Sequence, residues 1–343
     1  PSGLLSGEPS RYILQLQYGY GADIRFWNAS AEAGVRYEHN EIDKHSLSPD
    51  EAKRLNEMVF SASALQDYLQ CPLMFYFKHI LKVGEKNEVE EDPQANQIGN
   101  VVHNTMESLY RGKDCMSKTY LESLLKDFDK VKKVAATIFK EEFRVEDISG
   151  KHILAFHTIQ IYLRKILEED KRLLEEKGKE EFRIIGLELK LSATLQEKYK
   201  LKGFIDRLDS FEDDSVRVVD YKTGKFEEEE IAPKEDTATK LFEGAKNTNW
   251  PKIALQIWIY DYLLKNSREH YNGECIFNAV YSPRKIAQDK KCTEAPLIPE
   301  FYDECVKRTV SLIEEIRNLD LKFSPEVGCK ACGYCPYISL CKK

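Results

Sequence analysis

Apolar residues recur with two spacings along this chain, and the change between them divides it into segments. From Phe60 onwards, helical spacing predicts a helix that Ser61 or Ser63 caps, and more helices follow. In the middle of the chain the spacing shortens to that of strands. The predicted helices cover residues 98–110, 121–143, 153–174, 253–264 and 301–319, and the predicted strands cover residues 182–191, 199–211, 216–221 and 275–281.

This order of elements favours an α/β fold, with a central mixed β-sheet, flanking helices and a helical insertion before the strands. Residues 59–343 are predicted to form this domain. Residues 1–58 are interpreted as a lead-in or the remnant of a preceding region, in which Arg11 to Tyr18 alternate like a strand. Two acidic stretches, residues 84–94 and 226–250, are predicted to be loops.

Composition is that of a soluble globular protein, with 42% apolar and 32% charged residues. No apolar run approaches the ~20 residues of a membrane span, so we expect no membrane association. The net charge of −7 argues against extensive wrapping of DNA, although 51 Lys and Arg residues can still form local patches. No secretory signal is visible, so we expect a cytoplasmic protein. The chain does not begin with Met, which is compatible with a segment of a longer protein.

Two aspartates face each other in a predicted hairpin. If its turn centres on Asp213, Asp206 and Asp220 lie opposite each other, with Cβ atoms ~4.5–5.5 Å apart. Lys222 lies two residues beyond Asp220 and points to the same face. The apolar run from Val216 to Val219 indicates that this strand is buried on both faces. Two buried carboxylates this close repel each other unless a cation lies between them.

Such a pair of acids suits metal-assisted hydrolysis of a phosphodiester. Carboxylate oxygens bind Mg²⁺ or Mn²⁺, and one or two ions would fit this pattern. A bound ion lowers the pKa of a water molecule and stabilises charge on the phosphate. Lys222 can orient the water or neutralise the transition state, and Glu188 can add an acid from the preceding strand. The alternative is an exposed hairpin with charged residues on its solvent side.

Several short motifs together resemble the PD-(D/E)XK nucleases of the RecB and AddB type. The hairpin motif runs from Gly203 to Asp209 and continues from Asp220 to Gly224. The other matches are a GxxxH element from Gly99 to His103, the acidic Glu188, and a QxxxY element from Gln256 to Tyr260. Each motif alone is unspecific, but together they follow the order of the family.

The resemblance implies a restriction-endonuclease-like core and a role for each matching residue. Lys222 would be the catalytic lysine, and Glu188 would be an acid on the same face. The metal ligands that it implies are His103, Asp206, Asp220 and the main-chain carbonyl of Tyr221.

Gln256 and Tyr260 are four residues apart and share one helix face. The resemblance implies that they position DNA or the active-site residues. Taken alone, both residues could pack as an ordinary helix face, His103 could be a core or surface histidine, and Glu188 could be a surface acid.

Cysteines crowd at the C-terminus, where four of the nine fall within the last fifteen residues. Zinc or an iron–sulfur cluster accepts closely spaced thiolates. The AddB-type nucleases, and the CRISPR-associated adaptation nucleases related to them, carry a cluster held by one cysteine before the core and three after it. The resemblance thus implies a [4Fe–4S] cluster on Cys71, Cys332, Cys335 and Cys341. The additional Cys329 leaves open which three C-terminal thiols bind.

The resulting hypothesis is a metal-dependent DNA nuclease, exonucleolytic by family resemblance, in a helicase–nuclease machine for recombination and repair. No phosphate-binding loop of the Gly-x-x-x-x-Gly-Lys-Ser/Thr type is present, so the helicase would be another subunit or a region outside this chain. Three alternatives remain: a CRISPR-associated adaptation nuclease, a DNA-binding or scaffold module that does not cut, and a zinc-stapled interaction protein.

Overall fold

The computed structural model describes residues 12, 15–21, 40–84, 95–224, 226–246, 250–289, 291–326 and 330–341. It divides the chain into two compact units, Pro1–Glu38 and His39–Lys343. The described part of the first unit includes a π-helical segment, Gln15–Gly19, so the strand expected from Arg11 to Tyr18 is wrong for residues 15–18. The expected loop at residues 84–94 lies outside the described residues after residue 84.

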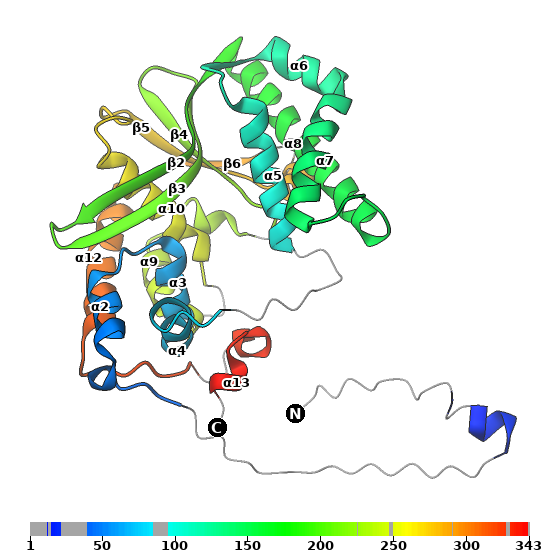
Figure 1. The fold of residues 1–343 in the computed structure, drawn as a ribbon. Helices are drawn as coiled ribbons and strands as arrows, with labels where there is room; N and C mark the ends of the chain where they lie inside the picture. The colour runs from blue at the N-terminus through cyan, green and yellow to red at the C-terminus, as the bar shows by residue number, and fades with distance from the viewer. Residues whose placement is uncertain are drawn as a thin grey trace. The chain divides into compact units, whose positions relative to one another are not determined.

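A six-stranded mixed sheet forms the centre of the second unit, and its strands follow one another in chain order (Figure 1). Strands β4 and β5 run parallel, and all other neighbouring pairs run antiparallel. The strands are β1 (Cys115–Ser117), β2 (Glu181–Leu195), β3 (Tyr199–Ser210), β4 (Ser215–Tyr221), β5 (Cys275–Tyr281) and β6 (Thr293–Pro296). The predicted α/β fold with a central mixed sheet is confirmed.

Helices cover both faces of this sheet (Figure 1). The insertion before β2 consists of α5 (Ala95–Tyr110), α6 (Lys118–Lys126), α7 (Phe128–Phe143) and α8 (Lys151–Lys177). The other face meets α2 (Pro49–Glu57), α3 (Ala62–Gln70), α4 (Pro72–Phe75), α9 (Thr237–Glu243), α10 (Lys252–Lys265) and α12 (Pro299–Arg317). The shorter helices are η2 (Lys44–Ser46), η3 (Tyr76–Ile80), η4 (Glu228–Glu230), η5 (Gly244–Lys246), α11 (Pro283–Asp289), η6 (Lys330–Tyr334) and α13 (Ile338–Cys341).

Strand β4 separates the two hydrophobic cores. Val218 packs in the core below α10, whereas its neighbour Val219 packs in the core formed with the insertion helices. Successive residues of a strand point to opposite faces, so a strand between two cores must be apolar at every position. The run from Val216 to Val219 meets this demand, apart from Arg217, and all four residues are buried.

Two predicted elements differ from the structure. The expected helix over residues 121–143 is two helices, α6 and α7, because Asp127 leaves the helical conformation with φ −105° and ψ 66°. The expected loop over residues 226–250 contains α9, in which Ala238 and Leu241 are buried. This short helix has too few apolar residues to show a helical period, and its packing stabilises it instead.

The compact unit begins before the predicted boundary at residue 59. Leu55 of α2 is buried in the main core, and Lys44 Nζ donates to the carbonyl oxygens of Glu315 and Asn318 at the end of α12. Ile42 forms a β-bridge with Phe323. Residues on both sides of the nuclease-like motifs therefore close the unit. None of the described helices combines the length and the apolar character that a membrane crossing requires.

Candidate active site

The hairpin of β3 and β4 places the two predicted aspartates across from each other. Arg207 pairs with Val219, and Asp209 pairs with Arg217, so the same register carries Asp206 opposite Asp220. Both side chains are buried. The prediction of a turn centred near Asp213 is thereby confirmed. Asp206 is held in place because its Oδ2 atom accepts a hydrogen bond of 2.9 Å from the main-chain N–H of Tyr221.

His103 reaches this pair from α5. Its Nδ1 atom lies 3.2 Å from Asp206 Oδ2, and its Nε2 atom donates to the carbonyl oxygen of Tyr221 at 2.6 Å. Burial opposes protonation of this imidazole, but the charge of Asp206 outweighs it and raises the pKa of His103 to about 9. One turn before His103, a Cβ atom on Gly99 would lie 3.3 Å from Thr223 Oγ1, so glycine allows α5 to approach the end of β4 closely.

Glu188 enters the site through an unusual backbone conformation. Leu187 pairs with Arg207 and Leu189 pairs with Ile205, which leaves Glu188 opposite Asp206. Its φ of +46° lies in the left-handed region, which is costly for a residue with a Cβ atom and concentrates at functional sites. Burial, followed by the charge of Asp206, raises the pKa of Glu188 to about 7.

Lys222 and Gln256 hold the second aspartate. Lys222 Nζ lies 2.9 Å from Asp220 Oδ2, and Gln256 Nε2 donates to Asp220 Oδ1 at 3.0 Å. Gln256 Nε2 also approaches the hydroxyl of Tyr260, one turn along α10. Burial raises the pKa of Asp220, although the charge of Lys222 opposes this shift. The structure therefore brings Gln256 and Tyr260 to the carboxylate rather than leaving them as an ordinary packing face.

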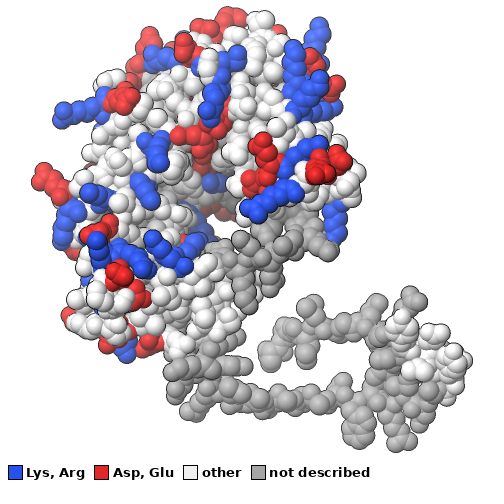
Figure 2. Space-filling model, in the orientation of Figure 1, with Lys and Arg blue, Asp and Glu red and all other residues white. Residues whose placement is uncertain are grey.

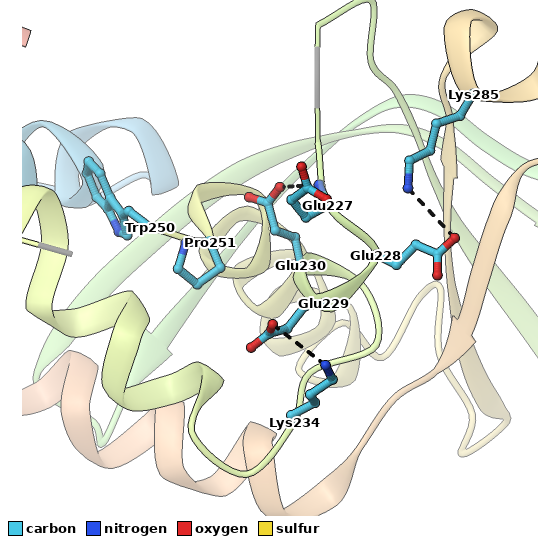
Figure 3. Close-up of a pocket in the computed structure, with 8 residues that line it drawn as sticks. All are labelled: Glu227, Glu228, Glu229, Glu230, Lys234, Trp250, Pro251 and Lys285. Atoms are coloured by element: carbon cyan, nitrogen blue, oxygen red, sulfur yellow. Dashed lines mark hydrogen bonds and ion pairs between the residues drawn. The ribbon is translucent and has the colours of Figure 1, made fainter. Parts of the chain in front are cut away.

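Glu230 is a neighbour of the site that the sequence did not single out. Its Oε1 atom accepts from the N–H of Ile253 in the first turn of α10, and its Oε2 atom accepts from the N–H of Glu227. Figure 3 shows this side chain on the wall of a cavity of about 660 Å³ that also holds Trp250. Its charge also helps to raise the pKa of Lys222. In the sequence, Glu230 is the last of four consecutive glutamates, which look like a solvated loop.

Behind the site lies a network of buried ions that the sequence also did not reveal. Arg207 forms two hydrogen bonds with Asp170 of α8, at 2.8 and 2.9 Å, and one with the hydroxyl of Tyr221 at 3.0 Å. Arg217 forms a second bidentate pair with Asp209, at 2.8 and 3.0 Å. These bonds tie β3 and β4 to the insertion. They fix the strand segments that carry the aspartates.

The donor set fits a hard divalent cation. Among the described residues, one group of at least three potential ligand atoms lies within 4.8 Å, and it consists of His103, Glu188 and Asp206. Asp220 Oδ2 is buried and accepts no hydrogen bond of good geometry, despite its contact with Lys222. Carboxylate oxygens and one imidazole suit Mg²⁺ or Mn²⁺.

The predicted cluster cysteines lie at the junction of the two ends of the unit. The N–H of Glu326 donates to Cys71 Sγ at 3.4 Å, and Cys332 Sγ donates to the carbonyl of the same residue at 3.6 Å. Cys335 and Cys341 pack against the same core as Cys71. Within the described ranges, these sulfur atoms do not form a group of three within 4.8 Å. Cys329 lies outside the described residues.

A mixed sheet with acids, a histidine and a lysine at one point defines a class of α/β protein with a carboxylate-rich metal centre. The chain belongs to the PD-(D/E)XK nuclease superfamily, whose sequence model matches residues 59–342. Members of this superfamily use divalent metals, in accord with the donor set.

Relatives with curated descriptions include two helicase-associated proteins. The chain is 25% identical to an ATP-dependent helicase/deoxyribonuclease subunit of Carboxydothermus hydrogenoformans, over 50% of this chain and 16% of that protein. It is 23% identical to a protein of the same description from Clostridium perfringens, over 72% of this chain and 21% of that protein. An uncharacterised protein of Rickettsia typhi is 24% identical over 48% of this chain and 18% of its own length. The matched segments therefore span about a fifth or less of these relatives.

Proposed function

We propose that this domain hydrolyses DNA phosphodiester bonds with the help of Mg²⁺ or Mn²⁺, as an exonuclease. The convergence of Asp206, Asp220, Glu188 and His103 on one point, with Lys222 against Asp220, carries this proposal. Superfamily membership supports the same chemistry.

Metal held by Asp206, Asp220, His103 and the carbonyl of Tyr221 would supply a Lewis acid and an acidified water molecule. The residues of the chain keep these groups in position. The N–H of Tyr221 fixes the carboxylate of Asp206, and Gln256 fixes that of Asp220. Lys222 holds a positive charge at the site, where it can stabilise charge that develops on a phosphate oxygen.

Cleavage of labelled single- and double-stranded DNA tests this proposal directly. We expect wild-type protein to release short products with Mg²⁺ or Mn²⁺, and we expect Asp220→Ala and Lys222→Ala to lose this activity. Lys132→Ala, which removes an exposed lysine paired with Asp129, is a matched control and should cut like wild type. A wild-type protein that cuts with neither metal, or site variants that cut as fast as wild type, would refute the assignment.

We further propose that the domain works beside a helicase, provided by another subunit or by a region outside this chain. The descriptions of the relatives as helicase/deoxyribonuclease subunits support this proposal. Reconstitution with the candidate helicase should make degradation of linear duplex DNA depend on ATP. Degradation that is equally fast without ATP would contradict the partnership.

We also propose that Cys71, Cys332, Cys335 and Cys341 hold a [4Fe–4S] cluster. The shared contact of Cys71 and Cys332 with Glu326 supports this assignment, since it joins a residue after α3 to the C-terminal segment. A link across so long a loop stabilises the fold by ~4–5 kcal/mol in the chain-entropy account of cross-links.

Iron, zinc and acid-labile sulfide analysis of protein purified without oxygen separates the possible occupants. We expect iron and sulfide together with visible absorbance, and we expect Cys71→Ala to lose both absorbance and stability. Cys115→Ala, at an exposed cysteine, is the control and should keep the cluster. Zinc without sulfide, or an unchanged cluster in Cys71→Ala, would refute the ligand assignment.

A further inference from the structure

The outer halves of β2 and β3 form a two-stranded ribbon with one buried and one exposed face. On β3, Leu201 and Ile205 point into the core, and a Cβ atom on Gly203 would meet Leu263 and Tyr260 of α10. The residues between them are exposed, and so are their cross-strand partners. The exposed pairs are Lys190 with Phe204, Ser192 with Lys202, and Thr194 with Lys200.

We call Lys190, Lys200, Lys202 and Phe204 the basic strip. The strip begins beside the candidate metal centre, because Phe204 precedes Asp206 by two residues and Lys190 follows Glu188 by two. Two residues of a strand advance by about 6.6 Å. A polymer bound at the carboxylates therefore reaches the first pair of the strip within a single step along the ribbon.

The lysines of the strip differ from most other lysines of this acidic protein. Over the face in Figure 2, basic side chains stand beside acidic ones in many places. Lys132 and Lys165, for example, pair with acids on their own helices at 3.0 and 2.7 Å. Within the described part of the chain, neither a hydrogen bond nor an ion pair engages the ammonium groups of the strip, and its exposed pairs include no acid. Their charge is available to an anionic ligand.

Phe204 gives the strip an aromatic surface. Its side chain is 47% exposed, although burying a phenylalanine is ordinarily favourable. Lys190 Nζ lies 5.5 Å from the centre of its ring, so a cation and a ring stand side by side on the exposed face. Lysines that follow a phosphate backbone, together with an aromatic ring that stacks on a base, are the means by which proteins bind single strands.

We propose that the basic strip binds the single-stranded DNA segment that adjoins the scissile phosphodiester. This inference rests on the proposed nuclease function and names its substrate. A single strand is favoured over a duplex because Phe204 can stack only on a base whose face is open. Nucleic acid is favoured over an acidic protein because the strip leads to a site for phosphodiester chemistry. The strip holds the strand, and the carboxylates act on its end.

Fluorescence anisotropy with a labelled oligothymidylate, in EDTA to prevent cleavage, tests the proposal. We expect Lys200→Ala/Lys202→Ala to weaken binding about 10- to 30-fold at 0.1 M salt and to reduce the slope of log K against log salt by about 1.4. Phe204→Ala should weaken binding about tenfold, with an unchanged salt slope. The matched control, Lys132→Ala/Lys165→Ala, should bind like wild type. Circular dichroism should show all variants folded, since the altered side chains are exposed.

Cleavage assays separate this inference from the proposed function. With Mn²⁺, the strip variants should raise KM for single-stranded DNA and leave hydrolysis of bis(p-nitrophenyl) phosphate unchanged, because that small ester does not reach the strip. A wild-type protein that cuts nothing refutes the proposed function, and the binding assay still decides whether the strip holds DNA.

Two results would overturn the inference. One is strip variants that bind oligothymidylate as tightly as wild type and the lysine control. The other is wild-type protein that binds oligothymidylate no better than a blunt duplex of the same length, which would show that the strip does not select single strands.

Discussion

Replacing Arg207 by Met tests how far the buried ions support the active site. The guanidinium is fully buried and lies between Asp170, which it contacts at 2.8 and 2.9 Å, and Asp209, whose Oδ2 atom is 2.8 Å from Arg207 Nε. Four aromatic rings, those of Tyr110, Phe182, Tyr221 and Tyr281, surround it at 4.9 to 5.6 Å. Methionine fills much of this volume but provides no charge.

The expected loss is large because two acids then lose their shared partner. Truncating one member of a buried ion pair typically costs about 3–5 kcal/mol, since the remaining charge has no compensation. Asp170 keeps the hydroxyls of Tyr110 and Tyr281, at 2.5 and 2.7 Å, which places the expected loss towards the lower end of that range. A domain with about 5–15 kcal/mol of total stability would be markedly weakened.

Urea unfolding followed by circular dichroism measures this loss. Arg111→Met is the matched control, because Arg111 pairs with Glu107 on the surface, and surface pairs contribute about 0–1 kcal/mol. Adding Asp170→Asn to Arg207→Met should restore part of the stability, since it removes an uncompensated charge. If Arg207→Met costs no more than Arg111→Met, or if Asp170→Asn makes the loss worse, the network does not stabilise the fold in this way.

Three further substitutions test separate features. Burial raises the pKa of Asp261 from 3.8 to about 7, so the folded state binds more protons and wild-type stability should fall by about 1.4 kcal/mol per pH unit between these values; Asp261→Asn should lack this slope in urea unfolding, and equal slopes would contradict the shift. Gly203→Ala would place its Cβ atom 2.9 Å from Leu263 and 3.3 Å from Tyr260, so it should cost about 1–3 kcal/mol and slow DNA cleavage, whereas full activity would show that Tyr260 tolerates the shift. Ser61→Ala removes the N-cap of α3 and should cost about 1 kcal/mol in the same unfolding assay, and no loss would show that water replaces the cap.

Features that depend on local pairing were predictable from the sequence. Asp206 and Asp220 could be placed opposite each other because the turn position fixes the register of an antiparallel hairpin. The cap at Ser61 was predictable for the same reason, since it involves residues three apart. His103 was different: its distance of 118 residues from Tyr221 left only the order of the family motifs to indicate its place.

Features that depend on distant partners were not predictable. Arg207 and Asp170 are separated by 37 residues and by the change from helix to strand, and each alone looks like a solvated charge. The left-handed conformation of Glu188 also has no local signal, because glutamate seldom adopts it and only the surrounding structure imposes it. Glu230 was hidden in an acidic run whose charges are typical of a solvated loop.

Binding of Mn²⁺ is the most direct test of the central claim, that the facing carboxylates form a metal centre. Electron paramagnetic resonance of free Mn²⁺ should show binding to wild-type protein, and saturation at a hundred times the dissociation constant should raise the free energy of unfolding by about 2.7 kcal/mol. Asp206→Asn and Asp220→Asn should lose both effects, whereas Asp129→Asn on the surface of α7 should keep them. Equal Mn²⁺ binding by all four proteins, or none by wild type, would contradict the assignment of this site.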